Sequence, residues 1–241
     1  MTITSQDLPA ILAAHKKWLD DPDTGKRAKL TGAELTEAEL TEADLTGANL
    51  TGAKLTGAKL TGATLTGAEL TEAELTEADL TGAKLTGAKL TGAKLTGAKL
   101  TGAKLTGANL SWSKLTRADL TWADLTGAKL AGSDLTGANL TRADLTWADL
   151  TGAKLAGSDL TRANLTGSNL IVGGNRSDRY AFFAIREPEG PVMIRAGCRY
   201  LTISAAIDHW TKTRGDTRLG YESLALVEHL RRMACIAGWI S

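Results

Sequence analysis

The sequence has few of the residues that usually build a catalytic or metal-binding centre. It contains three histidines and only two cysteines, Cys198 and Cys235. Their spacing matches no zinc motif, and no glycine pattern typical of a phosphate-binding or dinucleotide-binding turn is present. We therefore expect no cofactor, no bound metal and no catalytic residues.

Aromatic residues make up only 5% of the chain, and the formal net charge is +1. A charge this small gives no overall attraction to nucleic acid or to a membrane surface. The sequence has no run of eighteen apolar residues, and its N-terminus has no basic segment followed by an apolar one. We expect a cytoplasmic protein with reduced thiols that does not enter a membrane.

The sequence is dominated by one five-residue repeat. A leucine stands at every fifth position from Leu30 to Leu170, which gives 29 repeats, mostly written Ala-X-Leu-Thr-Gly. On an α-helix these leucines would spread around the cylinder, and on a flat strand they would alternate between faces. A common interior requires a short extended piece and a turn in each repeat, which predicts a β-solenoid.

Phrases such as Ala-Asn-Leu-Thr-Gly and Ala-Asp-Leu-Thr-Trp resemble the pentapeptide-repeat family. The resemblance implies a mainly β fold, a right-handed, four-sided parallel β-helix with four pentapeptides per coil and about seven coils. It also places each leucine, and the residue two before it, inside the rod. That second position is alanine in all repeats except those with Ser113, Ser133, Ser158 and Ser168.

Two long phrases occur twice within the repeats. Residues 31–49 recur with few changes at 66–84, and residues 121–135 recur at 146–160. The shifts are 35 and 25 residues, and neither is a multiple of 20. Duplication therefore proceeded by pentapeptides rather than by whole coils.

The chain divides into three regions. Residues 1–27 are predicted to form a helical cap over the open end of the rod, residues 28–172 the β-helix, and residues 173–241 a small α+β domain. The stretch from His15 to Ala28 resembles the lead-in of many bacterial pentapeptide-repeat proteins. His15 is interpreted as a structural residue; the alternative is a ligand or a base.

In the C-terminal region we expect a β-hairpin, with strands over 180–186 and 192–203, and then two helices over 204–212 and 221–237. The phrase Arg195-Ala196-Gly197-Cys198 resembles a small domain that follows the rod in some bacterial and phage members. This domain is a candidate site for homodimer formation.

Residues 20 apart should lie one above another in a four-sided rod. The outer positions then form columns, two of which begin with alternating charges: Glu34, Lys54, Glu74 and Lys94 in one, and Glu39, Lys59, Asp79, Lys99 and Asp119 in the other. From Lys84 to Arg117 there are basic residues and no acid, which predicts a basic collar spread over all four sides.

Three tryptophans, Trp112, Trp122 and Trp147, occupy outward positions where glycine is usual. Trp122, Arg142 and Arg162 follow one another at intervals of 20, which permits cation–π stacking. One interpretation is that these residues pack against the C-terminal domain or shield the backbone. The other is a partner-binding surface formed by the three tryptophans and two arginines.

Four functions remain open. The first is a non-enzymatic scaffold that binds an unknown protein partner. The second follows from the resemblance: some family members protect a type II topoisomerase by imitating DNA with a strongly acidic rod, whereas residues 28–172 carry 14 basic and 16 acidic residues. The third is nucleic-acid binding through the collar at 84–117, although nucleic acid is not the expected partner. The fourth is an enzyme with Cys198 as nucleophile and His209 or His229 as base.

Overall fold

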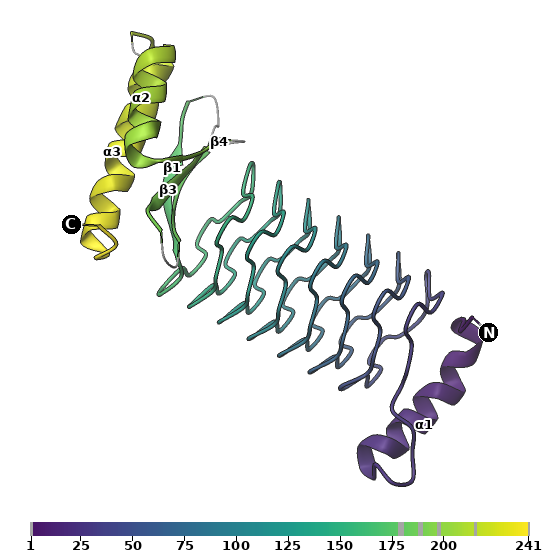
Figure 1. Cartoon of the computed structure of the whole chain (residues 1–241). Coiled ribbons are helices and arrows are strands. Elements are labelled where there is room, and N and C mark those ends of the chain that lie inside the picture. The colour runs from purple at the N-terminus through teal and green to yellow at the C-terminus, as the bar shows by residue number, and fades with distance from the viewer. Residues whose placement is uncertain (1, 178–180, 188–189, 197–198, 215, 241) are drawn as a thin grey trace.

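The computed structural model describes residues 2–177, 181–187, 190–196, 199–214 and 216–240. An N-terminal helix, a rod of stacked coils, a small sheet and a pair of helices follow one another along the length of the molecule (Figure 1). The two ends of the chain lie at opposite ends of the molecule. No described helix is long and apolar enough to span a bilayer.

The rod is a β-helix whose coils each take four pentapeptides. Parallel β-bridges connect outer residues 20 apart, from Lys29 with Asn49 to Asp144 with Asn164. Each coil both donates to the next coil and accepts from it: the Leu50 amide donates to the Glu69 carbonyl at 2.7 Å, and the Glu69 amide donates to the Ala48 carbonyl at 2.9 Å. Four bridges per coil give the rod four sides. Its handedness stays a prediction.

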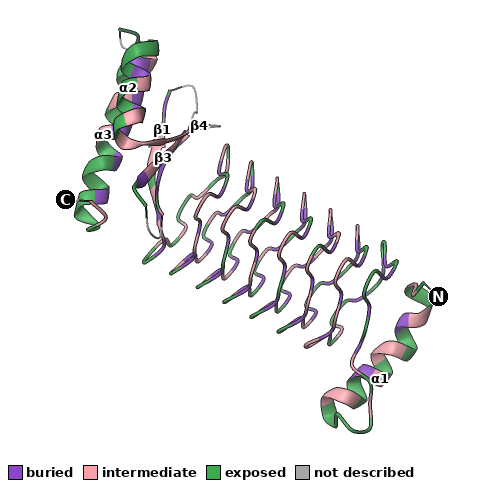
Figure 2. Ribbon diagram, viewed as in Figure 1, coloured by how far each residue is buried: buried purple, intermediate pink, exposed green. Residues whose placement is uncertain are grey.

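The interior consists of the leucines and the small residues two positions before them. Leucines from Leu30 to Leu155 are at most 1% exposed, and Figure 2 shows this buried lining along the rod. Removing such a side chain from water contributes about 2 kcal/mol. Ser113 fills one of the small positions, and its hydroxyl donates to the Leu110 carbonyl at 2.7 Å. A local acceptor thus satisfies this hydroxyl, whereas the buried hydroxyl of Ser133 has no hydrogen-bond partner among the described residues.

The N-terminal segment closes the first coil. A 3-10 turn, η1 (Ser5–Asp7), leads into α1 (Leu8–Asp20), and before the turn Thr4 forms a parallel bridge with Glu34. His15 of α1 is fully buried, and its Nδ1 accepts a hydrogen bond from the Ala28 amide at 3.1 Å. Burial lowers the pKa of His15, so the neutral form that can accept this bond is favoured. The contacts agree with a structural role.

The C-terminal region is a four-stranded antiparallel sheet covered by two helices. The strands are β1 (Leu170–Asn175), β2 (Ala181–Arg186), β3 (Val192–Ala196) and β4 (Arg199–Thr202), in that order across the sheet. The helices α2 (Ile203–Arg214) and α3 (Arg218–Ile236) follow.

The expected hairpin is present as β2 and β3, which pair antiparallel, but the expectation of only two strands is wrong. The stretch 192–203 contains two strands, β3 and β4, which pair antiparallel with Ala196 opposite Arg199. A further strand, β1, begins at Leu170, inside the range assigned to the repeats, and pairs with β2.

Strand β2 is buried on both faces, which explains its uninterrupted apolar sequence. Phe183 and Ile185 pack with the leucines of the rod, whereas Phe182 and Ala184 pack with the helices. The Phe182 ring lies 5.1 Å from the ring of Trp210 in α2. The sheet is therefore a layer between the last coil and the helical pair.

Polar contacts fasten this layer to the rod. The side-chain oxygen of Asn169 accepts from the Leu150 amide at 2.7 Å, in place of the main-chain carbonyl of Asn169 that the repeat would use. The Asn169 carbonyl accepts from the Arg186 amide of β2 at 2.9 Å. Arg195 of β3 donates to the Gly152 carbonyl at 3.2 Å. Part of the open edge of the last coil is satisfied in this way.

Candidate interaction site

The backbone turns between one side of the rod and the next at the second residue after each leucine, here called the corner position. Glycine is usual there because φ is positive, as at Gly52 with φ 64°. Ten corner residues are not glycine and still have φ between 56° and 61°. A side chain in this conformation costs roughly 1–2 kcal/mol.

These ten residues differ between the two halves of the rod. The first half has four glutamates: Glu37, Glu42, Glu72 and Glu77. The second half has three tryptophans and three arginines: Trp112, Arg117, Trp122, Arg142, Trp147 and Arg162. Strained backbone that carries large exposed side chains is a reason to look for function at those positions.

Two tryptophans lie flat over a glycine of the next coil. A Cβ atom on Gly132 would lie 2.5 Å from the Trp112 ring, and one on Gly167 would lie 2.5 Å from the Trp147 ring. The glycine one coil further along is thus needed for the ring to rest against the rod. The rings are nevertheless 71% and 70% exposed.

Trp122 has an arginine rather than a glycine above it. The Cζ atom of Arg142 lies 4.5 Å from the centroid of the Trp122 ring, so the predicted cation–π contact is present. Trp122 remains 58% exposed. Arg162 follows one coil later in the same corner column.

The five predicted partner-binding residues do not form one patch. Trp147 lies 25 residues after Trp122 and so occupies the neighbouring corner one coil further along. Trp112 lies ten residues before Trp122, at the opposite corner. Because all three rings are mostly exposed, the interpretation that they pack against the C-terminal domain is wrong.

Charges on three sides of the rod are largely paired within the chain. The predicted columns make ion pairs between neighbouring coils, from 2.6 Å for Glu39–Lys59 to 3.8 Å for Asp134–Lys154. The other pairs of this kind are Glu34–Lys54, Glu69–Lys89, Glu74–Lys94 and Asp79–Lys99. Three lysines of the predicted collar, Lys89, Lys94 and Lys99, are therefore held by acids of the preceding coil.

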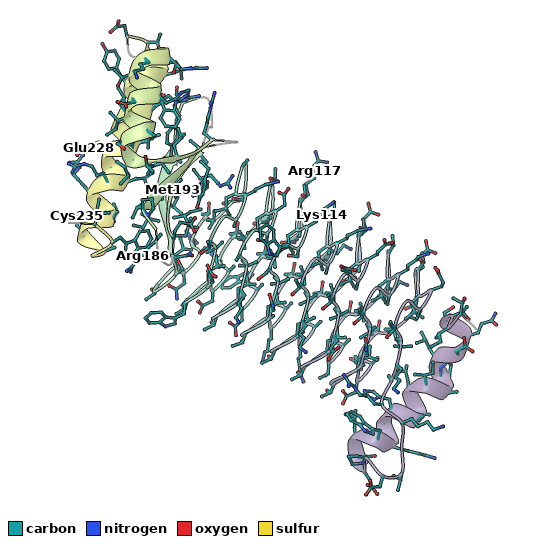
Figure 3. All side chains as sticks on the ribbon, viewed as in Figure 1. Lys114, Arg117, Arg186, Met193, Glu228 and Cys235 are labelled. Carbon is teal, nitrogen blue, oxygen red and sulfur yellow. The ribbon has the colours of Figure 1, made fainter. Side chains whose placement is uncertain are left out.

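The alternation of charge does not hold throughout: one predicted column stacks like charges beyond Lys94, and so do outer positions elsewhere. Bridges connect Lys84 with Lys104, Lys94 with Lys114, and Asp124 with Asp144. Within the rod, which is described throughout, Lys84, Lys104, Lys114 and Arg117 make no ion pair. Figure 3 shows Lys114 and Arg117 projecting from the middle of the rod.

The aspartates at outer positions stabilise turns. Burial works to raise the pKa of Asp124, but hydrogen bonds from Thr126 and Thr106 outweigh it and hold the pKa below its usual value. The Thr126 amide donates to this carboxylate at 3.0 Å and the Thr106 hydroxyl at 2.8 Å. Asp124 is therefore ionised at neutral pH and unsuited to act as a general acid.

Conventional active-site chemistry has little support in the described residues. No group of three histidine, cysteine or acidic residues among them could hold a metal ion. A cavity of about 610 Å³ lies between α1 and the first coil, but its lining, which includes Ile11, Trp18 and Lys29, has no acid or histidine. Cys198 lies outside the described residues, and Cys235 is exposed on α3.

The comparisons with known proteins agree with the repeat. The family model for pentapeptide repeats matches in eight copies between residues 26 and 171, and the overlapping matched ranges include 26–62, 53–92, 83–121, 93–132, 103–142, 118–157 and 143–171. A comparison with curated proteins gave no significant match.

Three solved structures illustrate the likeness. HetL from Nostoc sp. strain PCC 7120, involved in heterocyst differentiation regulation, is 38% identical over 60% of this chain and 73% of its own, with a TM-score of 0.37. Rfr23 from Cyanothece 51142 is 38% identical over 37% of this chain and 62% of its own, with a TM-score of 0.37. QnrB1, a plasmid-mediated fluoroquinolone resistance protein, is 20% identical over 58% of this chain and 88% of its own, with a TM-score of 0.28. Because the matched repeats extend without interruption from residue 26 to residue 171, the chain belongs to the pentapeptide-repeat family.

Proposed function

We propose that the protein is a non-enzymatic binding rod of the cytoplasm, a right-handed, four-sided β-helix that presents tryptophan and arginine to a protein partner. The observation that carries the proposal is the corner column in which Trp122, 58% exposed, lies beneath Arg142. Tryptophan and arginine are the residues most enriched at the energetic centres of protein interfaces.

Backbone strain supports the proposal. Glycine would occupy the corner at residue 122 without strain, whereas tryptophan has φ 60° there. A ring that stays 58% exposed gains only part of its possible burial within the monomer. A partner that covers the ring would recover this stabilisation.

Imitation of DNA fits the surface less well. A polyanion mimic needs a continuous negative field, and Lys84, Lys104 and Lys114, none of which forms an ion pair within the described rod, place positive charge in its middle. Direct binding of nucleic acid is also less favoured, because Lys89, Lys94 and Lys99 are already paired with acids. We expect no mobility shift of duplex DNA at low salt.

The proposal is tested by affinity capture with quantitative mass spectrometry. A double variant, Trp122→Ser with Arg142→Ser, should lose the captured partner. The matched control is Trp112→Ser, which removes an equally exposed tryptophan from the opposite corner, and it should keep that partner. Equal capture by the wild type and the double variant would contradict the proposal.

A further inference from the structure

One side of the rod carries no ion pair of its own. This side, called here the unpaired side, has the outer positions Asp44, Thr64, Lys84, Lys104, Asp124, Asp144 and Asn164, which consecutive bridges connect. None of the ion pairs within the described rod involves any of these residues. The lysines are therefore available to a neighbour. The Asp124 carboxylate already accepts from Thr126 and Thr106 and is attracted by Lys104 on the preceding coil, but a carboxylate can accept a further hydrogen bond.

The order of charges on the unpaired side is antisymmetric about its middle. Two lysines, Lys84 and Lys104, are followed by two aspartates, Asp124 and Asp144. Beyond them on either side come the uncharged residues Thr64 and Asn164. A second copy turned end for end would place each lysine opposite an aspartate: Lys84 opposite Asp144, and Lys104 opposite Asp124.

The two corner columns that border the unpaired side are complementary in shape to those of a second copy turned end for end. One contains Gly82 and Gly102 and then Trp122 and Arg142; the other contains Gly87, Gly107 and Gly127 and then Trp147. A two-fold axis that lies in the interface, across the rods between the coils of Lys104 and Asp124, keeps each border column facing its own kind. It places Trp122 opposite Gly102, Arg142 opposite Gly82 and Trp147 opposite Gly87.

Every large corner residue would thus meet a glycine, and every charge on four successive coils would meet its opposite. We infer that the unpaired side is the contact surface for a second copy of this chain, packed antiparallel about that two-fold axis. The inference rests on the proposed function as a protein-binding rod and names the partner. It gives an isologous interface, in which the same surface serves both copies.

The other sides are poorer candidates. A column of alternating charges could also face a second, antiparallel copy with opposite charges in contact. However, the charges of Glu39–Lys59 at 2.6 Å and Asp79–Lys99 at 3.7 Å are already paired within one chain. A parallel arrangement on the unpaired side would place lysine against lysine. Like charges directly opposite one another oppose association.

The expected association is weak. The two copies overlap over the six coils from Thr64 to Asn164. At about 4.8 Å per coil, and with five residues per side at about 3.3 Å each, the contact face measures roughly 29 by 16 Å, or about 450 Å² per copy. Stable interfaces bury about 800 Å² per partner. The dimer should therefore form only at high protein concentration and weaken as salt screens its charges.

Sedimentation equilibrium of the full chain over a wide concentration range, at low and high salt, tests the inference. Lys84→Asp with Lys104→Asp should weaken self-association at least tenfold, and so should Asp124→Lys with Asp144→Lys. An equimolar mixture of these two variants should associate again, because one copy then presents four acidic residues and the other four basic ones. The control, Lys114→Asp with Lys129→Asp, makes the same charge change on other sides and should leave self-association unaltered.

Because the Asp124 carboxylate also accepts from the Thr126 amide, its reversal could impair folding. Trp122→Gly with Trp147→Gly therefore serves as a further variant. It leaves every charge of the unpaired side in place and should still weaken association at least tenfold.

A wild-type chain that stays monomeric at all concentrations would overturn the inference. So would self-association that none of these substitutions alters, which would place the contact in the C-terminal domain instead. If the chain is monomeric yet captures another protein through Trp122 and Arg142, the proposed function stands and only the second copy is excluded.

Discussion

The two halves of the rod share one interior and have different surfaces. Leu75 in the first half and Leu120 in the second are equally buried, and the bridges advance by 20 residues in both. On the surface, the first half has glutamates at its corners and mostly paired charges, whereas the second has tryptophan and arginine. The interior repeat thus specifies the fold and leaves the outer and corner positions free to diverge.

The largest effect tests whether the interiors are equivalent. Leu75→Ala and Leu120→Ala should each lower the free energy of unfolding by about 3 kcal/mol, because each leaves a cavity among side chains that cannot close it. Urea unfolding should give values for the two variants that agree within about 0.5 kcal/mol. A clearly larger loss in one half would show that its coils support each other differently.

An intermediate effect tests the tryptophan corners. Gly127 and Gly132 both have positive φ, but a Cβ atom would meet nothing at Gly127 and would lie 2.5 Å from the Trp112 ring at Gly132. Gly127→Ala should cost about 1 kcal/mol of stability, and Gly132→Ala about 1–3 kcal/mol more. Adding Trp112→Gly should remove the excess. Equal losses at the two glycines would mean that the ring swings aside freely.

The smallest expected change in stability comes from replacing corner residues of the two halves by glycine. Glu77→Gly relieves a positive φ of 57° and should raise the free energy of unfolding by up to about 1 kcal/mol. Trp122→Gly relieves similar strain but loses the Arg142 contact, worth about 0.5–1 kcal/mol, so the net change should be near zero. Thermal unfolding at low protein concentration distinguishes the two. A stabilising Trp122→Gly would show that the contact contributes little.

The leucine period was sufficient to predict a solenoid, because each repeat must turn if every leucine is to reach a common interior. The four pentapeptides per coil were expected only from the resemblance to the pentapeptide-repeat family. A helix was likewise expected within residues 1–27, and α1 spans Leu8–Asp20. The C-terminal sheet was predicted less well. Strand β2 packs on the rod and on the helices at once, and that double burial depends on residues distant in sequence.

The contact between Trp122 and Arg142 could be predicted because residues 20 apart lie on neighbouring coils. The need for glycine beneath Trp112 could not, since it depends on the direction in which the ring leans. The stacking of Lys84 on Lys104 could also have been predicted. It follows from applying the same 20-residue spacing to the other columns of outer residues.

The four-pentapeptide coil has a consequence for the repeated phrases. A duplication of 20 residues would lengthen the rod and leave the rest of the chain facing as before, whereas 25 residues add a coil and also rotate every later element by a quarter turn. Trp122 and Trp147 belong to copies offset by 25 residues, and they stand on adjacent corners for this reason. The number of pentapeptides therefore sets both how far the C-terminal helices lie from α1 and the direction in which they point.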